Sequence, residues 1–571
     1  MTRQLPKTTD ELMKMTWPDF EEMYQEVEAV PVSEKNVDQW LSQWSRVSEC
    51  VDEQYQRLIV ATSVNTIDEA ANESYTNFLD HTYPNAQKHE QKLKEILLAS
   101  GLEPKGFQIP LRNMRSDTKL FREANLPLLS EEQKLSIAFD KVFGEQTVEF
   151  DGKEVTIYGL SPYLQSPTRS TREKAWIMGM ERQYADRTAI NELWVKFMEL
   201  RQKIAKNADL NDYREYKWKQ YYRFDYTPED CISFHNAIEK VVVPAVTKLL
   251  KRAGEKMGVD VLKPWDMDIK NYVDPANRPT LKPFKTPEEQ IEKTQSIFNH
   301  IDPTLGEYFR TILDENLIDL PNRKHKGPGA YCTGYNLIRK PFVFCNSVGT
   351  QNDVSTLIHE SGHAFHVFES AKLPYMPQLN VTMEFAEVAS MGMEFLASPF
   401  YNQNFGGFYN DQDTARAEIE HHITSLLFWP YMSVVDLFQH WVYQNPTDAM
   451  NPDRCDEEWG KLWDRFMPDQ DWTGYEQYKN TGWHRKIHIH QIPFYYIEYG
   501  LAQLGASQIW VNSLKDQPKA VANYRHALSL GATKDLPGLF EAAGVHLAFD
   551  EVTLRKNVDA MMDRIEVLER I

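Results

Sequence analysis

The sequence predicts a mainly helical protein with one or two small β-sheets. Over most of the 571 residues, apolar side chains recur three and four positions apart, which is the spacing of helices that bury one side. Runs of strand type occur only around residues 148–158 and 327–346. With 42% hydrophobic and 26% charged residues, the chain is apolar enough to form a large core and too apolar to be disordered.

The elements follow one another in a simple order. Residues 10–100 have long stretches at helical period, which predict packed antiparallel helices. Between about 101 and 165 this pattern gives way to Gly- and Pro-rich stretches, and the Asp-Gly pair inside VEFDGKEVTIY predicts a β-hairpin. Two short strand runs are expected on either side of Arg339, Lys340 and Pro341. From 352 onward the pattern is helical again, with one long helix expected from about Thr414 to Tyr443.

Charge and cysteine content restrict the possible partners. The formal net charge of −20 disfavours binding to phosphate backbones and anionic lipid, so we expect neither nucleic acid nor a membrane as partner. No segment approaches the roughly 20 apolar residues of a membrane helix, and the first residues lack the apolar core of a secretory signal. The five cysteines are scattered without a CxxC pair, so free thiols are expected. We expect a soluble protein of the cytoplasm; its oligomeric state is not predicted.

The stretch LIHESGHAFH, residues 357–366, places three histidines and one glutamate in an apolar run. Asn352 and Asp353 are good N-cap residues, and no proline follows them, so a helix is expected over about 354–368.

On a helical wheel the histidines of this stretch share one side. His363 lies about 40° and His366 about −20° from His359, whereas the apolar side chains occupy the opposite side. Two imidazoles one turn apart can both reach a tetrahedral zinc ion. Glu360, about 100° from His359, could act on a bound water without being a ligand. Paired histidines also occur on solvent-exposed helix faces, so a third ligand is needed to decide.

A second helical stretch, VTMEFAEVASMGMEF, supplies candidates for that ligand. Glu384, Glu387 and Glu394 lie within about 80° of one another on a wheel, apart from the bulky apolar residues. Three carboxylates on one side of an apolar helix are costly unless they meet cations. A zinc ion with histidine ligands would satisfy them.

HESGHAFH followed by EFAEVASMGMEF, with Glu387 28 residues after His359, resembles the zinc oligopeptidases of family M3, the thimet oligopeptidase and oligoendopeptidase F group. The chain is most similar to the bacterial oligoendopeptidase F and Pz-peptidase branch. PGAY, PFVFCN, GTQNDVSTLIHE and PFYYIEYG extend the resemblance over at least residues 200–510. It implies that His359, His363 and Glu387 bind one Zn²⁺ per chain and that Glu360 is the general base.

The resemblance further implies two helical lobes with a deep central channel, and a small β-sheet beside the HExxH helix. Glu384 and Glu394 are then interpreted as carboxylates that orient the histidines. We expect an N-terminal helical region at 1–105, the rest of an N-terminal lobe with the hairpin at 106–200, and a catalytic domain at 201–571.

The expected function is that of a zinc-dependent metalloendopeptidase. It would hydrolyse short oligopeptides by attack of a zinc-bound water on the scissile carbonyl. A metallocarboxypeptidase or dipeptidase on a related scaffold stays open as an alternative. So does a catalytically silent binding protein stabilised by a metal.

The segment WHRKIHIHQIPFYYIEYG holds three further histidines, His484, His488 and His490. They could themselves hold a metal, but no acid lies between them. The resemblance instead implies that His488, Tyr496 and Tyr499 line the active site, where a tyrosine hydroxyl would donate to the oxyanion of the transition state. Which tyrosine donates is left open. The alternative that these aromatic residues only pack in the core is open as well.

A peptide substrate would be held most simply as an added strand on a sheet edge. GAYCTGYNL, just before the HExxH helix, is a plausible edge strand. A purely structural hairpin is the alternative.

Overall fold

The computed structural model describes residues 5–267 and 278–571, and it is mainly helical with small sheets, as predicted. Contacts between Cα atoms divide the chain into two compact units. The first unit comprises Met1–Thr118, Thr280–Thr414 and Gly505–Leu547, and the second comprises Lys119–Pro279, Ala415–Leu504 and Ala548–Ile571. Each unit includes segments from more than one of the three consecutive regions expected from the sequence. The boundaries of those regions stay a prediction. The deep channel stays a prediction as well.

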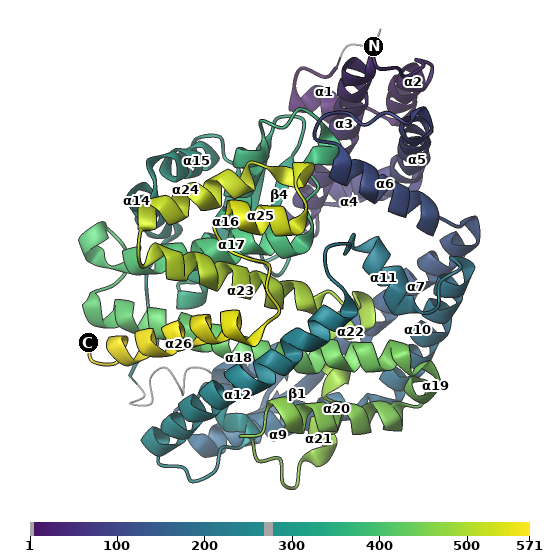
Figure 1. The fold of residues 1–571 in the computed structure, drawn as a ribbon. Coiled ribbons are helices and arrows are strands. Elements are labelled where there is room, and N and C mark those ends of the chain that lie inside the picture. Colours follow the sequence, from purple (N-terminus) through teal and green to yellow (C-terminus); the bar gives the residue numbers. More distant parts are fainter. Residues whose placement is uncertain (1–4, 268–277) are drawn as a thin grey trace. The chain divides into compact units, whose positions relative to one another are not determined.

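The first unit contains the N-terminal helices, a three-stranded sheet and the helices that pack on it (Figure 1). Its elements are α1 (Thr9–Met13), α2 (Trp17–Glu28), α3 (Val37–Val64), α4 (Glu69–Asn77), α5 (Tyr83–Ser100), α6 (Gln108–Leu120), α14 (Pro287–Ile301), α15 (Pro303–Asp314), β3 (Ile318–Pro321), β4 (Tyr331–Tyr335), β5 (Lys340–Ser347), α16 (Gln351–Ser370), α17 (Met383–Ala397), α24 (Gln517–Leu528) and α25 (Leu536–Ala542).

The second unit is helical apart from one hairpin. Its elements are α7 (Leu126–Gly144), β1 (Thr147–Phe150), β2 (Lys153–Thr156), α8 (Ser161–Leu164), α9 (Arg169–Ala185), α10 (Arg187–Asn207), α11 (Tyr213–Gln220), α12 (Pro228–Met257), α18 (Asp411–Gln444), α19 (Pro446–Ala449), α20 (Pro452–Phe466), α21 (Glu476–Asn480), α22 (Ile487–Gln491) and α26 (Glu551–Leu568). The helix α23 (Tyr496–Ser513) begins in this unit and ends in the first.

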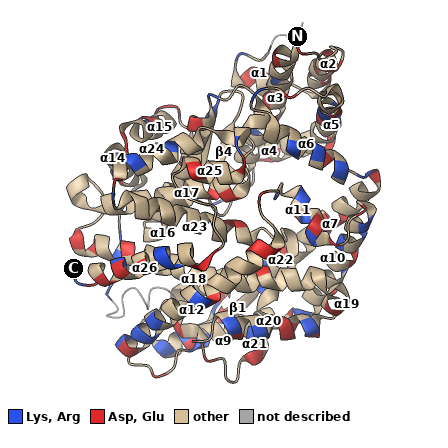
Figure 2. Ribbon diagram, in the orientation of Figure 1, with Lys and Arg blue, Asp and Glu red and all other residues tan. Residues whose placement is uncertain are grey.

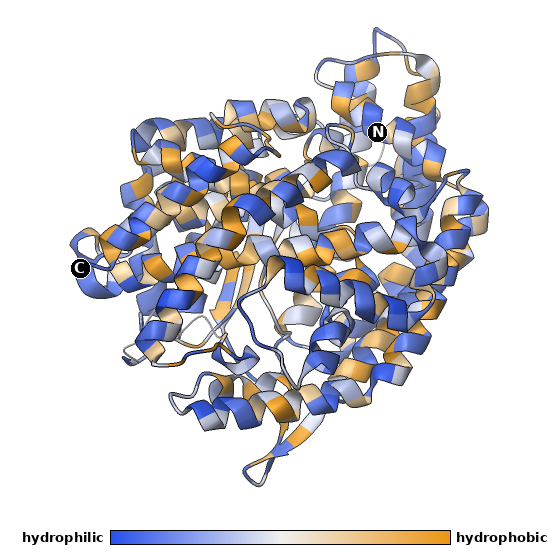
Figure 3. Cartoon of the chain, turned by 60° about the horizontal axis from the view of Figure 1, so that its bottom comes forward, coloured by the Kyte–Doolittle hydropathy of each residue, from blue (hydrophilic) through white to orange (hydrophobic). Residues whose placement is uncertain are grey.

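The helices expected between residues 10 and 100 are confirmed. Helices α2, α3 and α5 contact one another around a core that includes Trp40 and Trp44. Figure 3 shows hydrophilic and hydrophobic segments alternating along the helices, as expected for helices that bury one side. The long helix predicted from about Thr414 to Tyr443 is also confirmed, as α18.

The region from 101 to 165 is only partly as expected. The Asp-Gly hairpin is confirmed: β1 and β2 pair antiparallel, and Asp151 and Gly152 both have positive φ, as a two-residue type I′ turn requires. The prediction that helices are interrupted before this hairpin was wrong, because α6 and α7 occupy much of 108–144. Pro110 lies in the first turn of α6, where a missing N–H leaves no helical hydrogen bond unmade.

The sheet of the first unit has the order β3–β5–β4, with β5 parallel to β3 and antiparallel to β4. Strand β3 was not expected, because four residues give too short a pattern. Lys340 and Pro341 begin β5 instead of separating two runs, and the turn before them ends at Arg339 with a φ of 56°. Helix α16 packs on β4 and β5, so the small sheet beside the HExxH helix is confirmed (Figure 1).

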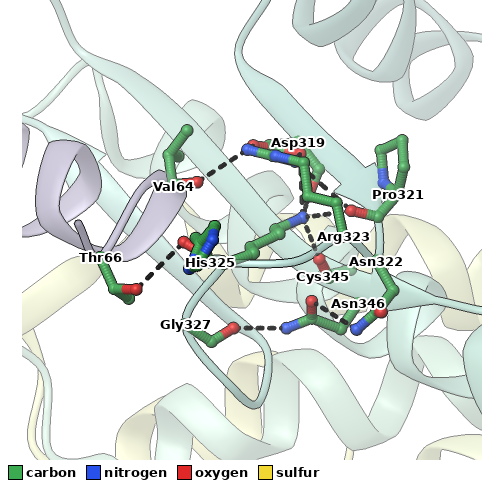
Figure 4. A network of polar contacts seen from close by, with 11 residues as sticks. Val64, Thr66, Asp319, Pro321, Asn322, Arg323, His325, Gly327, Cys345 and Asn346 are labelled. Carbon is green, nitrogen blue, oxygen red and sulfur yellow. Dashed lines mark hydrogen bonds and ion pairs between the residues drawn. The ribbon is translucent and has the colours of Figure 1, made fainter. Parts of the chain in front are cut away.

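A polar network fixes the loop that leads into β4 (Figure 4). The buried Lys326 ammonium donates to the Asp319 carboxylate at 2.9 Å and to the carbonyl oxygens of Pro321 and Cys345. The Asn346 amide donates to the Gly327 carbonyl at 2.7 Å. Because these backbone carbonyl groups are hydrogen-bonded, the loop holds β4 in place beside the HExxH helix.

The thiols are as predicted, and charged residues are spread over both units. Figure 2 shows charged residues of both signs over helices of both units, so the net charge is not gathered on one element. All five cysteines are free, as predicted, and four of them are buried. Within residues 5–267 and 278–571, no helix is long and apolar enough to cross a membrane. The cytoplasmic location stays a prediction.

Candidate metal and active site

Helix α16 carries the HExxH residues and begins earlier than predicted. Its N-cap is Thr350, whose hydroxyl accepts from the Asp353 N–H while the Asp353 carboxylate accepts from the Thr350 N–H. Asn352 and Asp353 are therefore not the N-caps that the sequence suggested. Asp353 is the N3 residue of a capping box. Its carboxylate also accepts from the N–H groups of Val348 and Gly349. This rigid start fixes the direction of α16 toward the site.

Helix α17 approaches α16 closely at Gly362, a residue that the sequence analysis did not single out. A Cβ atom at Gly362 would lie 2.5 Å from the Ala389 carbonyl oxygen and 2.7 Å from Ser390 Cα. Only glycine therefore permits this approach. The Ala389 carbonyl also accepts from the Tyr524 hydroxyl at 2.6 Å, which holds α17 against α24. The close approach brings Glu387 of α17 to the histidines of α16.

His359, His363 and Glu387 form one group, here called the metal-site cluster. The Nε2 atoms of His359 and His363 lie 3.5 and 3.8 Å from Glu387 Oε2. Zinc bonds of about 2.0–2.2 Å in a tetrahedron place neighbouring ligand atoms about 3.3–3.6 Å apart. The 3.5 Å distance lies in this range and the 3.8 Å distance slightly above it, so two imidazoles and one carboxylate at this spacing could hold a zinc ion.

Glu394 sets the tautomer of the first histidine. Its Oε1 lies 2.7 Å from His359 Nδ1. A carboxylate only accepts, so Nδ1 carries a proton, and Nε2, which faces Glu387, is the nitrogen left to bind a metal ion. Burial alone would lower the pKa of His359, but the two neighbouring carboxylates raise it well above its ordinary value. The cluster thus stabilises positive charge, as a cation site must.

Glu360 is buried beside this cluster. Its carboxylate accepts from the backbone N–H of Cys332 in β4, and burial raises its pKa to about 7. Glu384 and His366, also on α17 and α16, are buried too. Burial lowers the pKa of His366 to about 4 and its ring packs against Phe385, which suits a packing residue better than a ligand.

His488, Tyr496 and Tyr499 come together in the second unit. The His488 ring lies 4.9 Å from that of Tyr496 and 6.3 Å from that of Tyr499, centroid to centroid. The Lys486 ammonium donates to the Tyr496 hydroxyl oxygen at 2.7 Å, which leaves the O–H of Tyr496 to donate elsewhere. Burial, followed by the charge of Lys486, lowers the pKa of His488 to about 4, so its imidazole is neutral near pH 7.

The other histidines of this segment are core residues. His484 contacts the Asn191 amide oxygen at 2.8 Å, and the His490 ring stacks on Phe139 and Trp483. Among the described residues, no group with metal-ligand spacing includes His484, His488 or His490.

A second buried group of ligand-type residues joins α12 to α18, and no local sequence pattern indicates it. Cys231, Asp436 and His440 bring ligand-type atoms within 4.8 Å of one another. His235 Nε2 lies 2.8 Å and His440 Nε2 lies 3.2 Å from Asp436 Oδ2. We call Cys231, His235, Asp436 and His440 the α12–α18 cluster. Its members are i and i+4 pairs on two helices about 200 residues apart, so only the fold brings them together.

Comparisons with known proteins relate the chain to a peptidase family. Residues 162–558 match the model of peptidase family M3. A solved structure of a Pz peptidase A with an inhibitor is 26% identical with a TM-score of 0.85, covering 100% of this chain and 99% of that one. A putative oligoendopeptidase F from Bacillus anthracis is 26% identical with a TM-score of 0.79, covering 100% and 97%.

Curated relatives match over shorter stretches. Oligopeptidase PepF of Bacillus subtilis is 25% identical over 260 residues, 43% of this chain and 37% of that protein. An oligoendopeptidase F homolog of Mycoplasma pneumoniae is 25% identical over 344 residues, 55% and 52%. The chain thus spans about half or less of the curated relatives it matches. Because the family model covers most of the chain, the protein belongs to peptidase family M3.

Proposed function

We propose that the protein is a zinc-dependent metalloendopeptidase that hydrolyses short oligopeptides. The observation that carries this proposal is the convergence of two imidazole Nε2 atoms on one carboxylate oxygen, at 3.5 and 3.8 Å, next to the buried Glu360. Membership of peptidase family M3 supports it.

His359, His363 and Glu387 would hold one zinc ion per chain, with Glu394 fixing the orientation of His359. When bound, zinc would lower the pKa of a water and polarise the scissile carbonyl. Glu360 would take a proton from the attacking water and pass it to the leaving amine nitrogen. A carboxyl group whose pKa lies near neutrality suits both transfers.

His488, Tyr496 and Tyr499 would stabilise the transition state. A neutral His488 and the hydroxyl groups of the two tyrosines can each donate a hydrogen bond to the oxyanion of the tetrahedral intermediate. Removal of one such donor costs about 2.7–4 kcal/mol of transition-state stabilisation. Separate Tyr496→Phe and Tyr499→Phe variants would identify the principal donor, since only that variant should lose kcat with little change in KM.

Strand β4 would bind the substrate backbone. It is an edge strand of its sheet, and its Cys332 N–H donates to Glu360. An extended peptide added at this edge would have its carbonyl groups beside the general base.

The test uses internally quenched peptides blocked at both ends, with products identified by mass spectrometry. We expect internal cleavage that a chelator abolishes and added zinc restores. Glu360→Gln should retain zinc and lose activity about 10²–10⁴-fold. Cleavage only of peptides with a free terminus would favour an exopeptidase, and a zinc-containing protein with no cleavage would favour a silent binding protein.

A further inference from the structure

The segment from Lys486 to Tyr499 carries all three side chains proposed to act on the transition state, yet little regular structure supports it. It consists of the five-residue helix α22, a short connection and the first turn of α23. A five-residue helix leaves its last carbonyl groups without partners inside the helix. These groups, and the connection after them, are bonded to two buried arginines.

Arg201 of α10 binds the end of α22. Its side chain is fully buried, and its guanidinium donates to the carbonyl oxygens of Ile489 and His490. The other N–H groups donate to Glu132 at 2.7 Å and to the Tyr443 hydroxyl at 3.0 Å, so the guanidinium is held by fixed partners. Ile489, whose carbonyl it binds, is the neighbour of His488.

Arg223 binds the connection between the two helices. Its Nη2 donates to the Phe494 carbonyl at 2.6 Å and to Glu498 Oε1 at 2.7 Å. Both side chains of the Arg223–Glu498 pair are buried. The guanidinium also lies over the ring of Trp218, 4.7 Å from its centroid. Phe494 precedes the tyrosines, and Glu498 precedes Tyr499.

Phe494 has a strained backbone conformation that these contacts maintain. Its φ is 66°, in the left-handed region that a bulky aromatic residue rarely adopts. Its N–H donates to Gln439 Oε1 at 2.6 Å while its carbonyl accepts from Arg223, so both of its backbone groups have partners on other elements. Strain of this kind persists only where the surroundings enforce it, and it concentrates at functional sites.

A purely structural role for these arginines is the alternative. Burying a guanidinium is expensive, and well-packed apolar residues often stabilise a fold as well as a buried ion pair does. What apolar residues cannot do is bind carbonyl oxygens. Both arginines bind carbonyl groups within two residues of His488 or of a tyrosine of the proposed site.

We propose that Arg201 and Arg223 are positioning residues of the peptidase reaction, which hold His488, Tyr496 and Tyr499 in the arrangement that stabilises the transition state. The inference rests on the proposed function of these three residues. Arg223 contributes more to this positioning than Arg201. One of its nitrogens binds the carbonyl of the strained Phe494 and also, through Glu498, the first turn of α23.

The experiment compares Arg223→Lys with Arg172→Lys. Arg172 is a matched control in the same unit, because it too is buried, pairs with a carboxylate, Asp266, and donates to backbone carbonyl groups. Lysine keeps the charge but lacks the planar guanidinium that lies over Trp218 and brings Nη2 to both acceptors. We expect Arg223→Lys to lower kcat for a blocked peptide about 10- to 100-fold with zinc content unchanged and KM changed by less than about threefold. Arg172→Lys should leave kcat within about twofold.

A variant that lacks the positioned side chains distinguishes a positioning role of Arg223 from a general effect on stability. In a His488→Ala, Tyr496→Phe, Tyr499→Phe protein, Arg223→Lys should have almost no further effect on kcat, because the groups it positions are gone. The same loss of kcat in both backgrounds, or equal losses in Arg223→Lys and Arg172→Lys, would overturn the proposal.

Hydrogen exchange of the segment 487–499 provides a readout that needs no activity. Arg223→Lys should speed exchange there, and Arg172→Lys should not. Unchanged exchange in Arg223→Lys would contradict the positioning role even if the wild type proved inactive. An inactive wild type with faster exchange in Arg223→Lys would instead refute the proposed function and leave the anchoring of the segment supported. If Arg223→Lys does not fold, Glu498→Gln tests the same anchor more mildly.

Discussion

The metal-site cluster and the α12–α18 cluster each place a carboxylate between two histidines, but they differ in spacing and exposure. The nitrogen–oxygen distances are 3.5 and 3.8 Å in the first and 2.8 and 3.2 Å in the second. The side chains of His359 and His363 are 27% and 21% exposed, whereas those of His235 and His440 are 0% and 2% exposed. The first spacing accommodates a cation, whereas in the second His235 Nε2 is hydrogen-bonded directly to Asp436 and His440 Nε2 lies close to the same oxygen.

The groups that contact the Nδ1 atoms of the histidines also differ between the two clusters. His359 Nδ1 faces the Glu394 carboxylate, an acceptor, so its Nε2 lone pair is available. His440 Nδ1 faces Arg214 Nη1 at 3.4 Å, and arginine can only donate, so the proton of His440 belongs on Nε2, toward Asp436. Similar side chains can therefore form a proposed metal site or a buried polar network according to what surrounds them.

The largest expected effect concerns the network. Asp436→Asn would replace the charged oxygen that both imidazoles contact with a neutral amide oxygen in the core. We expect it to lower the free energy of unfolding by about 1.5–3 kcal/mol, the range of hydrogen bonds to charged groups, while metal content stays unchanged. Urea denaturation measures the loss. Asp464→Asn, which removes an ion pair from a carboxylate that is 66% exposed, should cost less than about 1 kcal/mol. Equal losses would show that the α12–α18 cluster has no special role in stability.

A methyl group at Gly362 should disturb the other cluster. Its Cβ would lie 2.5 Å from the Ala389 carbonyl, so α17 must move and Glu387 with it. We expect Gly362→Ala to cost about 1–3 kcal/mol of stability and to weaken metal binding. Thermal unfolding with and without zinc checks both. In Gly144→Ala the added Cβ meets nothing within 4 Å, and stability should be equal or slightly higher.

Removing the outer carboxylate of the metal-site cluster should have a more limited effect. Glu394→Gln can still contact His359 but no longer carries the charge that orients and polarises it. Metal affinity should fall about 10- to 100-fold, with activity recovered at high zinc concentration. Competition with a chromogenic chelator measures the affinity. An unchanged affinity would show that Glu394 does not tune this site.

The smallest effect is a pH dependence of the network. Burial lowers the pKa of His235 below its ordinary value, even though Asp436 acts to raise it. The unfolded chain therefore takes up a proton below about pH 6.5 that the folded protein does not, and His235 makes folding less favourable as the pH falls. The stability difference between wild type and His235→Gln should be smaller at pH 5 than at pH 7.5. A larger difference at pH 5 would mean that the folded protein holds His235 protonated.

Local pattern was enough to predict the elements that carry the proposed metal ligands. His359 and His363 share a helix face by spacing alone, and Glu387 follows on the next amphipathic helix, so α16, α17 and the Asp-Gly hairpin were all expected. Gly362 could not be recognised, because its importance depends on the backbone of a second helix. Neither could the α12–α18 cluster nor the arginines around Phe494, whose partners are distant in sequence. Strand β3 is too short to show a period of its own.

The most direct test of this account measures zinc per chain and peptidase activity in Glu387→Gln and Asp436→Asn, side by side with the wild type. We predict one zinc ion per chain in the wild type and in Asp436→Asn, which should remain active when folded. Glu387→Gln should lose both zinc and activity. Zinc retained in Glu387→Gln but lost in Asp436→Asn would place the metal in the α12–α18 cluster and contradict the account.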